Sequence, residues 1–171
     1  MVSRINRRTI LKLSICSLIF LSVFGCSKTP NALQDSTPKT IFFSTNAFKF
    51  YDLGFVKSYP NHTTLEIFNA GIVLLKMDCY KDKICLNTQC YAKDSVMRKF
   101  FGNDAFRELD FNAILKGQEI FSGENKRKIQ NGFEQNIMRE GMELNYNTTQ
   151  DSIELEIKDL QKKTIFSLAI H

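Results

Sequence analysis

The fold is decided by the stretch Ile153-Glu154-Leu155-Glu156-Ile157-Lys158, in which apolar and charged side chains alternate strictly. Successive side chains of a β-strand point to opposite faces of the sheet, so this alternation predicts a strand with one face on a core and the other in water. Residues 142–146 show the same pattern, and in residues 164–170 the side chains of Phe166, Leu168 and Ile170 share one face, with the smaller Ser167 and Ala169 on the other. Strands of this kind are typical of antiparallel sheets with one solvated face.

Further strands are expected closer to the N-terminus. Period-two patterns predict strands at Ile41–Tyr51, Thr63–Phe68 and Ile72–Tyr80, with a hairpin return through Ile84–Asn87. At Asp52–Gly54 the alternation changes phase, which predicts a bulge or bend.

Two short helices are expected between the strand-rich regions. Asp94 and Ser95 are typical N-cap residues ahead of the apolar run 96–101, and Gly102 stands where a C-terminal glycine belongs. Asp110 caps residues 111–116 in the same way, and Gly117 closes that run. The order of strands, two helices and strands predicts an α+β domain in which an antiparallel sheet curves around the helical insert.

The N-terminus combines positive charge, an apolar stretch and a cysteine. Arginines at positions 4, 7 and 8 precede apolar residues from Leu13 to Phe24, which is typical of a signal peptide and too short for a spanning helix. The sequence Val23-Phe24-Gly25-Cys26 resembles the lipobox read by the lipoprotein signal peptidase. We therefore expect a signal peptide at residues 1–25 and acylation of Cys26, with the acyl chains holding the exported protein at a membrane.

Sequence around the expected lipid anchor indicates where the domain begins. Ser27 follows the cysteine, and a residue other than aspartate there favours the outer membrane, with the domain facing the periplasm. Residues 26–39 are rich in Ser, Thr and Pro, so we expect a flexible tether followed by one domain at residues 40–171. The segment Asn6–Lys12 also resembles a twin-arginine export motif, which leaves two export routes open.

The net charge of +5 belongs to the expected signal peptide. Residues 1–25 hold four of the 23 Lys and Arg residues and none of the 18 Asp and Glu residues, so the remainder carries 19 basic against 18 acidic side chains. Nucleic-acid binding needs a basic stripe, which a nearly neutral chain does not offer. We therefore expect no nucleic-acid partner.

Residues that carry catalysis are scarce. The two histidines are His62, in an expected turn, and His171. The sequence shows no Ser, His and Asp arrangement, glycine-rich phosphate loop or zinc-spaced cluster. We expect no catalytic residues, no metal site and no cofactor, and so no enzyme.

Three cysteines follow Cys26, namely Cys79, Cys85 and Cys90. An exported protein enters an oxidising compartment in which disulfides form. Cys79 and Cys85 are symmetric about Asp82, so a hairpin centred there places them opposite each other within bridging range. We predict a Cys79–Cys85 disulfide with Cys90 free, while the other two pairings stay open.

Phenylalanine is abundant, with 15 Phe residues and no Trp. One face of the curved sheet either lines a cavity for acyl chains or packs as an ordinary closed core, and periodicity does not separate these two interpretations. The alternation selects eight residues for the wall of such a cavity: Phe48, Phe50, Leu65, Ile67, Val73, Leu75, Phe166 and Leu168.

Two motifs in the middle of the chain suggest a family. Residues 90–102 contain a tyrosine and a short helical run that ends Phe101-Gly102, and residues 110–117 read Asp-Phe-Asn-Ala-Ile-Leu-Lys-Gly. They resemble the helical insert of uncharacterised lipoproteins grouped with the localisation-of-lipoproteins A and B proteins. The resemblance implies a half-barrel of antiparallel strands with short helices across its open side, and a hydrophobic cavity that accepts lipid acyl groups.

Together these features predict a lipoprotein on the periplasmic side of the outer membrane that binds lipid or acyl chains, in lipoprotein or lipid handling. Its partners would be the membrane, through its own acyl chains, and a lipid or lipoprotein acyl group. The alternative is a structural or assembly accessory lipoprotein with a filled core and a protein partner.

Overall fold

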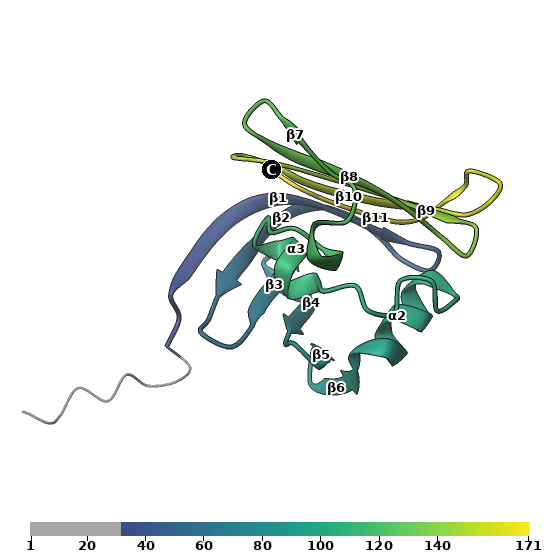
Figure 1. The fold of residues 1–171 in the computed structure, drawn as a ribbon. Coiled ribbons are helices and arrows are strands. Elements are labelled where there is room, and N and C mark those ends of the chain that lie inside the picture. The colour runs from purple at the N-terminus through teal and green to yellow at the C-terminus, as the bar shows by residue number, and fades with distance from the viewer. Residues whose placement is uncertain (1–31) are drawn as a thin grey trace, which may run out of the picture. The chain divides into compact units, whose positions relative to one another are not determined.

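Residues 32–171 are described by the computed structural model of the protein, and they contain one antiparallel sheet of eleven strands (Figure 1). The strands are β1 (Asp35–Thr45), β2 (Lys49–Ser58), β3 (Thr63–Asn69), β4 (Ile72–Cys79), β5 (Lys83–Leu86), β6 (Gln89–Ala92), β7 (Lys126–Ile129), β8 (Gly132–Arg139), β9 (Met142–Thr149), β10 (Ile153–Lys158) and β11 (Thr164–Ile170). The expected signal peptide, the lipid cysteine Cys26 and residues 27–31 of the expected tether lie outside the described residues.

The sheet consists of two meanders that meet at its centre. The spatial order is β6-β5-β4-β3-β2-β1-β11-β10-β9-β8-β7, so the first and last strands are neighbours. Across this junction Ile41 pairs with Ile170, and backbone hydrogen bonds of 3.0 Å join Thr40 to His171 in both directions. β6 and β7 are the two open edges of the sheet.

The segment between β6 and β7 leads from one edge of the sheet to the other. It contains α2 (Lys93–Phe101), α3 (Phe111–Leu115) and the 3-10 helix η1 (Phe121–Gly123). α2 contacts β5, β6 and β11, α3 contacts β3, and both helices lie on the same side of the sheet (Figure 1). The helical segment therefore covers one face of the sheet and encloses the core.

The helix ends follow the predicted capping, with one exception. The Asp110 carboxylate accepts hydrogen bonds from the backbone N–H groups of Asn112 and Ala113 at 2.9 and 3.3 Å, which satisfies free donors in the first turn of α3. Gly102 ends α2 with a φ of 76°, a conformation that favours glycine. The expected N-cap at residues 94–95 is wrong, because α2 begins at Lys93 without a side-chain cap.

Phenylalanine rings join the helical segment to the sheet. The Phe166 ring on β11 lies 5.4 Å from the Phe43 ring on β1, and 5.4 and 5.6 Å from the rings of Phe101 on α2 and Phe111 on α3. All four side chains are buried. Edge-to-face pairs of this kind stabilise a core beyond the burial of their area. The centre of the covered face is therefore a packed core.

The predicted α+β class is wrong, because the structure is nearly all β. Within residues 32–171, strands make up 55% and helices 12%, and α2 is the only helix of seven or more residues. The sheet is open, so an eleven-stranded antiparallel sheet with one short helical segment replaces the expected half-barrel. Among residues 32–171, no helix combines the length and the apolar character needed to cross a membrane.

Three strands that the sequence did not predict account for much of this difference. β6 and β7 have only four residues each, too few to show a period. In β8 the buried position 135 is a glutamine, which obscures the apolar alternation. The Gln135 side chain accepts a hydrogen bond from the Ile120 N–H at 2.9 Å and donates one to the Ile120 carbonyl at 3.0 Å, so its burial is satisfied.

The stretch Ile41–Tyr51, predicted as one strand, contains a hairpin turn. Thr45 Oγ1 accepts hydrogen bonds from the N–H groups of Ala47 and Phe48 at 3.3 and 3.1 Å. Such local bonds compete with the strand ladder, so β1 ends at Thr45 and β2 begins four residues later. β1 also begins at Asp35, so residues 35–39 of the expected tether are part of the sheet.

The expected bulge at Asp52–Gly54 is absent, because β1 and β2 stay in unbroken register. Gly54 is required instead by a close approach. A Cβ atom there would lie 2.3 Å from the Cδ1 atom of Ile41 and 2.3 Å from the Glu66 carbonyl oxygen. The missing side chain therefore leaves room for Ile41 above β2.

The predicted Cys79–Cys85 disulfide is also wrong, because Cys85 is bonded to Cys90. β4 and β5 pair Cys79 with Ile84 and Asp78 with Cys85, one residue from the expected symmetry. Cys79 and Cys85 therefore point to opposite faces of the sheet, whereas Cys85 and Cys90 face each other on β5 and β6. Cys79 is free and buried, and burial raises the pKa of its thiol well above the usual value.

Candidate functional site

The eight residues expected to line a cavity are found in three places. Five belong to the buried core: Phe50, Leu65, Ile67, Phe166 and Leu168. Phe48 and Leu75 line an apolar cleft at the border of this core, and Val73 is exposed on the neighbouring hairpin. The structure therefore brings seven of the expected residues to the core side of the sheet and places two of them in a cleft, whereas Val73 pairs with Phe68 on the other face.

The apolar cleft has a volume of about 340 Å³ and lies between the β1–β2 hairpin, β4, β5 and α2. Phe43 and Phe48 come from the hairpin, Leu86 from β5 and Phe100 from α2. The Phe100 ring packs edge-on against Phe43 at 6.0 Å, so α2 forms one wall. Lys99 is the one charged residue among those that line the cleft, and it is exposed.

Beside the cleft, the hairpin between β3 and β4 carries exposed apolar side chains. Ile72 is 73% exposed, Val73 45% and Leu74 41%, and Leu74 also lines the cleft. We call residues 72–74 the β3–β4 tip. Single exposed apolar residues are ordinary, but a contiguous group beside an apolar cleft is typical of an interaction site.

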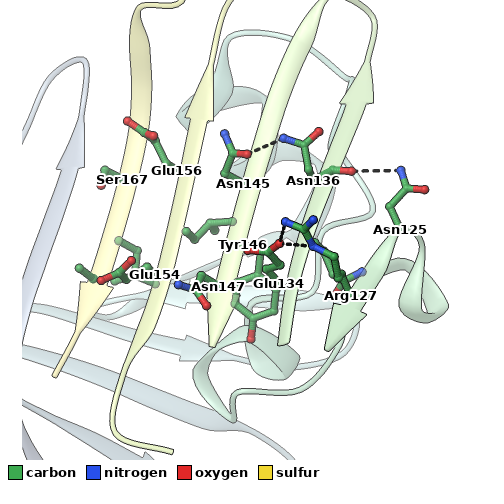
Figure 2. Close-up of a pocket in the computed structure, with 14 residues that line it drawn as sticks. Asn125, Arg127, Glu134, Asn136, Asn145, Tyr146, Asn147, Glu154, Glu156 and Ser167 are labelled. Atoms are coloured by element: carbon green, nitrogen blue, oxygen red, sulfur yellow. Dashed lines mark hydrogen bonds and ion pairs between the residues drawn. The ribbon is translucent and has the colours of Figure 1, made fainter. Parts of the chain in front are cut away.

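A second, larger hollow lies on the opposite face of the sheet, over β7–β11. This polar groove has a volume of about 780 Å³ (Figure 2). Strand register arranges its side chains in two rows across the strands. The first row is Arg127, Glu134, Asn147, Glu154 and Ala169, and the second is Asn136, Asn145, Glu156 and Ser167.

Hydrogen bonds order much of the second row. The Asn136 amide donates to Asn145 Oδ1 at 2.5 Å (Figure 2). It also donates to Glu143 Oε1 at 3.0 Å. Asn125 donates to the backbone carbonyl of Asn136 at 3.0 Å. Glu156 accepts a hydrogen bond from the Thr164 hydroxyl at 2.7 Å. These contacts hold amide and carboxylate groups in place along the groove.

Asn147 in the first row has an unpaired acceptor. Its Oδ1 atom is buried and has no hydrogen-bond partner within residues 32–171. The residues opposite it on β8 and β10 are Glu134 and Glu154, whose ionised carboxylates accept hydrogen bonds and do not donate them. The groove therefore contains an acceptor that the two residues opposite it do not satisfy.

Charges in the groove are largely balanced. Glu134 forms an ion pair with Arg127, and Glu156 forms one with Lys158 at 2.7 Å. Burial acts to raise the pKa of Glu156, but hydrogen bonds from Lys158 and Thr164 outweigh it and lower that pKa. Glu154 has no ion pair in the described part of the chain.

Other polar clusters are structural in character. His62 stacks between Tyr59 and Tyr80, with ring centroids 4.4 and 4.5 Å away, and burial lowers the pKa of the imidazole. This stack closes the turn between β2 and β3. Within residues 32–171, no group of three or more His, Cys, Asp or Glu side chains is placed to hold a metal ion.

No protein-family model matches the chain, and no match is found among curated proteins. The resemblance of residues 90–117 to the localisation-of-lipoproteins proteins therefore stays a prediction. Function has to be inferred from the residues and their geometry.

The polar groove was not selected from the sequence. In the sequence, the groove is visible only as the polar positions of two alternating strands. These are Glu154 and Glu156 on β10 and Asn145 and Asn147 on β9, and their alternation predicts a solvated face but no binding site. Their register across strands, and the unrecognised β7 and β8, decide that they gather in one hollow.

Proposed function

We propose that the protein is an exported lipoprotein, anchored through Cys26 on the periplasmic side of the outer membrane, whose domain binds an acyl chain in the apolar cleft. The observation that carries this proposal is the continuity of the cleft with the exposed β3–β4 tip. Leu74 belongs to both, so an apolar chain that reaches the tip has an unbroken apolar path to Phe48 and Leu75.

The size of the cleft supports a single linear chain as the ligand. Its 340 Å³ falls near the lower end of the range for small-molecule sites, about 300–1,000 Å³. The packed core around Phe166 leaves the ligand at the border of the domain rather than in its centre. A lipid that uses this site would insert one chain and keep its headgroup outside.

The charge at the rim supports an acidic headgroup or a free fatty acid. Lys99 projects from α2 beside Phe100 and has no ion pair within residues 32–171. An exposed ammonium next to the apolar cleft attracts a carboxylate or phosphate, while the acyl chain contacts the apolar side chains of the cleft. Because exposed charges are screened, this contact would add orientation more than affinity.

The alternative function keeps the same anchor but uses a protein partner. Its support is the filled core, in which Phe43, Phe106, Phe111 and Phe166 are each at most 2% exposed. In that case the β3–β4 tip would dock an apolar surface of another protein, and the cleft would stay empty of lipid.

Fluorescence binding distinguishes these two functions. Residues 27–171, without the signal peptide and lipid cysteine, would be titrated with dansyl-labelled undecanoic acid, whose emission rises in an apolar site. We expect saturable binding that Leu74→Asp weakens at least about tenfold, a loss of about 1.4 kcal/mol, because the new carboxylate lies in the path of the chain.

The matched control is Leu53→Asp, which places the same charge on β2 at a side chain that is 63% exposed and lies away from the cleft. It should leave binding unchanged. Absence of saturable binding by the unmodified domain, or equal losses in both variants, would refute acyl binding and favour the protein-partner function.

A further inference from the structure

We propose that the polar groove over β7–β11 binds a neutral glycan chain, whose hydroxyl groups hydrogen-bond to Asn145, Asn147 and Glu154. The groove lies on the face of the sheet opposite the helical segment, so this site is separate from the apolar cleft. It requires neither the acyl ligand nor the lipid anchor.

The dimensions of the groove suit an extended chain. Its lining residues come from five adjacent strands, and five strands at a spacing of about 4.8 Å span about 19 Å. Small side chains, Ser167 and Ala169, form the β11 end of its floor. A chain of several sugar rings can therefore lie across the strands, between the two rows of polar side chains.

The mixture of donors and acceptors matches hydroxyl groups. A sugar hydroxyl donates one hydrogen bond and accepts others, and an Asn side chain offers both an acceptor and donors. Carboxylates add strong acceptors, and Arg127 adds donors at the β7 end. Because Glu134 and Glu156 are already ion-paired, the groove has little net charge with which to select a cation, a phosphate or a nucleic acid.

Asn147 provides the independent sign of a missing ligand. Its buried Oδ1 atom lacks a donor, and its neighbours across the strands are acceptors. A buried acceptor without a partner is unfavourable, and most buried polar atoms in proteins are paired. Asn147 is only partly buried as a whole, so a turn of its amide toward the groove would let a hydroxyl of a bound sugar donate to this atom.

An aromatic surface continues the first row beyond the groove. Ala169 pairs with Phe42 on β1, and Phe42 pairs with Tyr51 on β2, so both rings lie on the groove side of the sheet. The two ring centroids are 6.4 Å apart, and Tyr51 is 71% exposed. The apolar faces of sugar rings pack on aromatic rings of this kind, which a free ion or a small polyol would not use.

Calorimetry and NMR titration test this site. Residues 27–171 would be titrated with cellotetraose, chitotetraose and maltotetraose. At least one should bind and shift amide resonances in β8–β10. Asn147→Leu should weaken that binding at least tenfold without lowering the free energy of unfolding, because it removes an unsatisfied buried acceptor.

Two further measurements separate this result from the acyl site. Leu74→Asp should leave glycan binding unchanged, and Asn147→Leu should leave binding of dansyl-labelled undecanoic acid unchanged. If none of the three tetrasaccharides binds, or if binding survives Asn147→Leu, the glycan site does not exist, whatever the outcome for the acyl cleft.

Discussion

Glu143 illustrates how single residues tune the solvated face of the sheet. The Lys162 ammonium donates to its carboxylate at 2.5 Å and the Asn136 amide at 3.0 Å. These hydrogen bonds hold the pKa of Glu143 at about 2, against an ordinary value of 4.5. The carboxylate therefore stays ionised in the folded protein under conditions that protonate it in the unfolded chain.

The sign of the resulting pH dependence follows from this difference. Because the folded pKa is the lower one, the stabilising contribution of Glu143 is present above about pH 4.5 and disappears as the pH falls towards about 2. Glu143→Gln should make unfolding less dependent on pH in that interval. Urea denaturation across the interval measures it.

Lys163→Ala, a change of a neighbouring exposed lysine, should keep the dependence of the unmodified protein. If Glu143→Gln and the unmodified protein lose stability in parallel, the assigned hydrogen bonds do not exist in solution.

Residue-scale features could be predicted only in part. Alternation assigns Asn145 to the polar face of its strand, which the structure confirms, but no local pattern shows that Asn147 has an unpaired acceptor. That property depends on the carboxylates of two other strands. The predicted Cys79–Cys85 disulfide is wrong for a similar reason. A shift of one residue in the hairpin register places the two thiols on opposite faces of the sheet.

At the scale of elements, the packing of β2 against Ile41 and β3 requires a glycine at position 54. A Cβ atom at position 54 would meet the Ile41 side chain and the Glu66 backbone at 2.3 Å, and the backbone atom cannot move without disturbing the β2–β3 ladder. Gly54→Ala should therefore destabilise the protein by about 2–3 kcal/mol. Chemical denaturation followed by circular dichroism gives this value.

The neighbouring change Leu53→Ala serves as the control, because Leu53 is largely exposed and its loss should cost less than about 0.5 kcal/mol. Similar stability of the two variants would show that β2 does not approach Ile41 as closely as described.

Strand prediction succeeded where alternation was regular and failed where polar groups had special roles. β3, β4, β9, β10 and β11 follow the predicted ranges closely. The β1–β2 turn depends on the Thr45 hydroxyl, and β8 contains a glutamine bonded to the Ile120 backbone. A period-two pattern of apolar and polar residues carries no information about such bonds.

At the scale of the molecule, an open sheet has to protect two edges. Unpaired edge strands invite association with other chains, and short strands and charged side chains discourage it. β7 is four residues long and carries Lys126, Arg127 and Lys128. β6 is equally short, and the Cys85–Cys90 disulfide ties it to β5.

The disulfide should therefore affect both stability and association. Replacing Cys85 and Cys90 together by alanine should destabilise the protein by about 2 kcal/mol, as expected for a short closed loop. It should also increase self-association, because the β6 edge is less firmly held. Thermal unfolding and size-exclusion chromatography measure the two effects.

Cys79→Ala provides the comparison, since it leaves the disulfide intact. Peptide mapping of the oxidised protein should find Cys85 linked to Cys90 and a free thiol at Cys79. A link between Cys79 and Cys85 would contradict the register of β4 and β5.

The error in fold class belongs to this scale. The residues that end the helices, Asp110 and Gly102, have clear sequence signals. The four-residue strands β6 and β7 have none, so the sequence predicts a larger share of helix than the structure contains. Which strands pair across the whole chain is a non-local property, and the β1–β11 junction has no signature in the sequence of either strand alone.

The β1–β11 junction also determines when the fold can be completed. A ribosome releases residues 35–92 well before residues 164–170, so β1 has a neighbour on only one side during most of synthesis. Pairings between distant parts of a chain form slowly, and exposed edges are prone to aggregation in the meantime. A chain halted before residue 164 would present that edge to a chaperone or to another nascent copy.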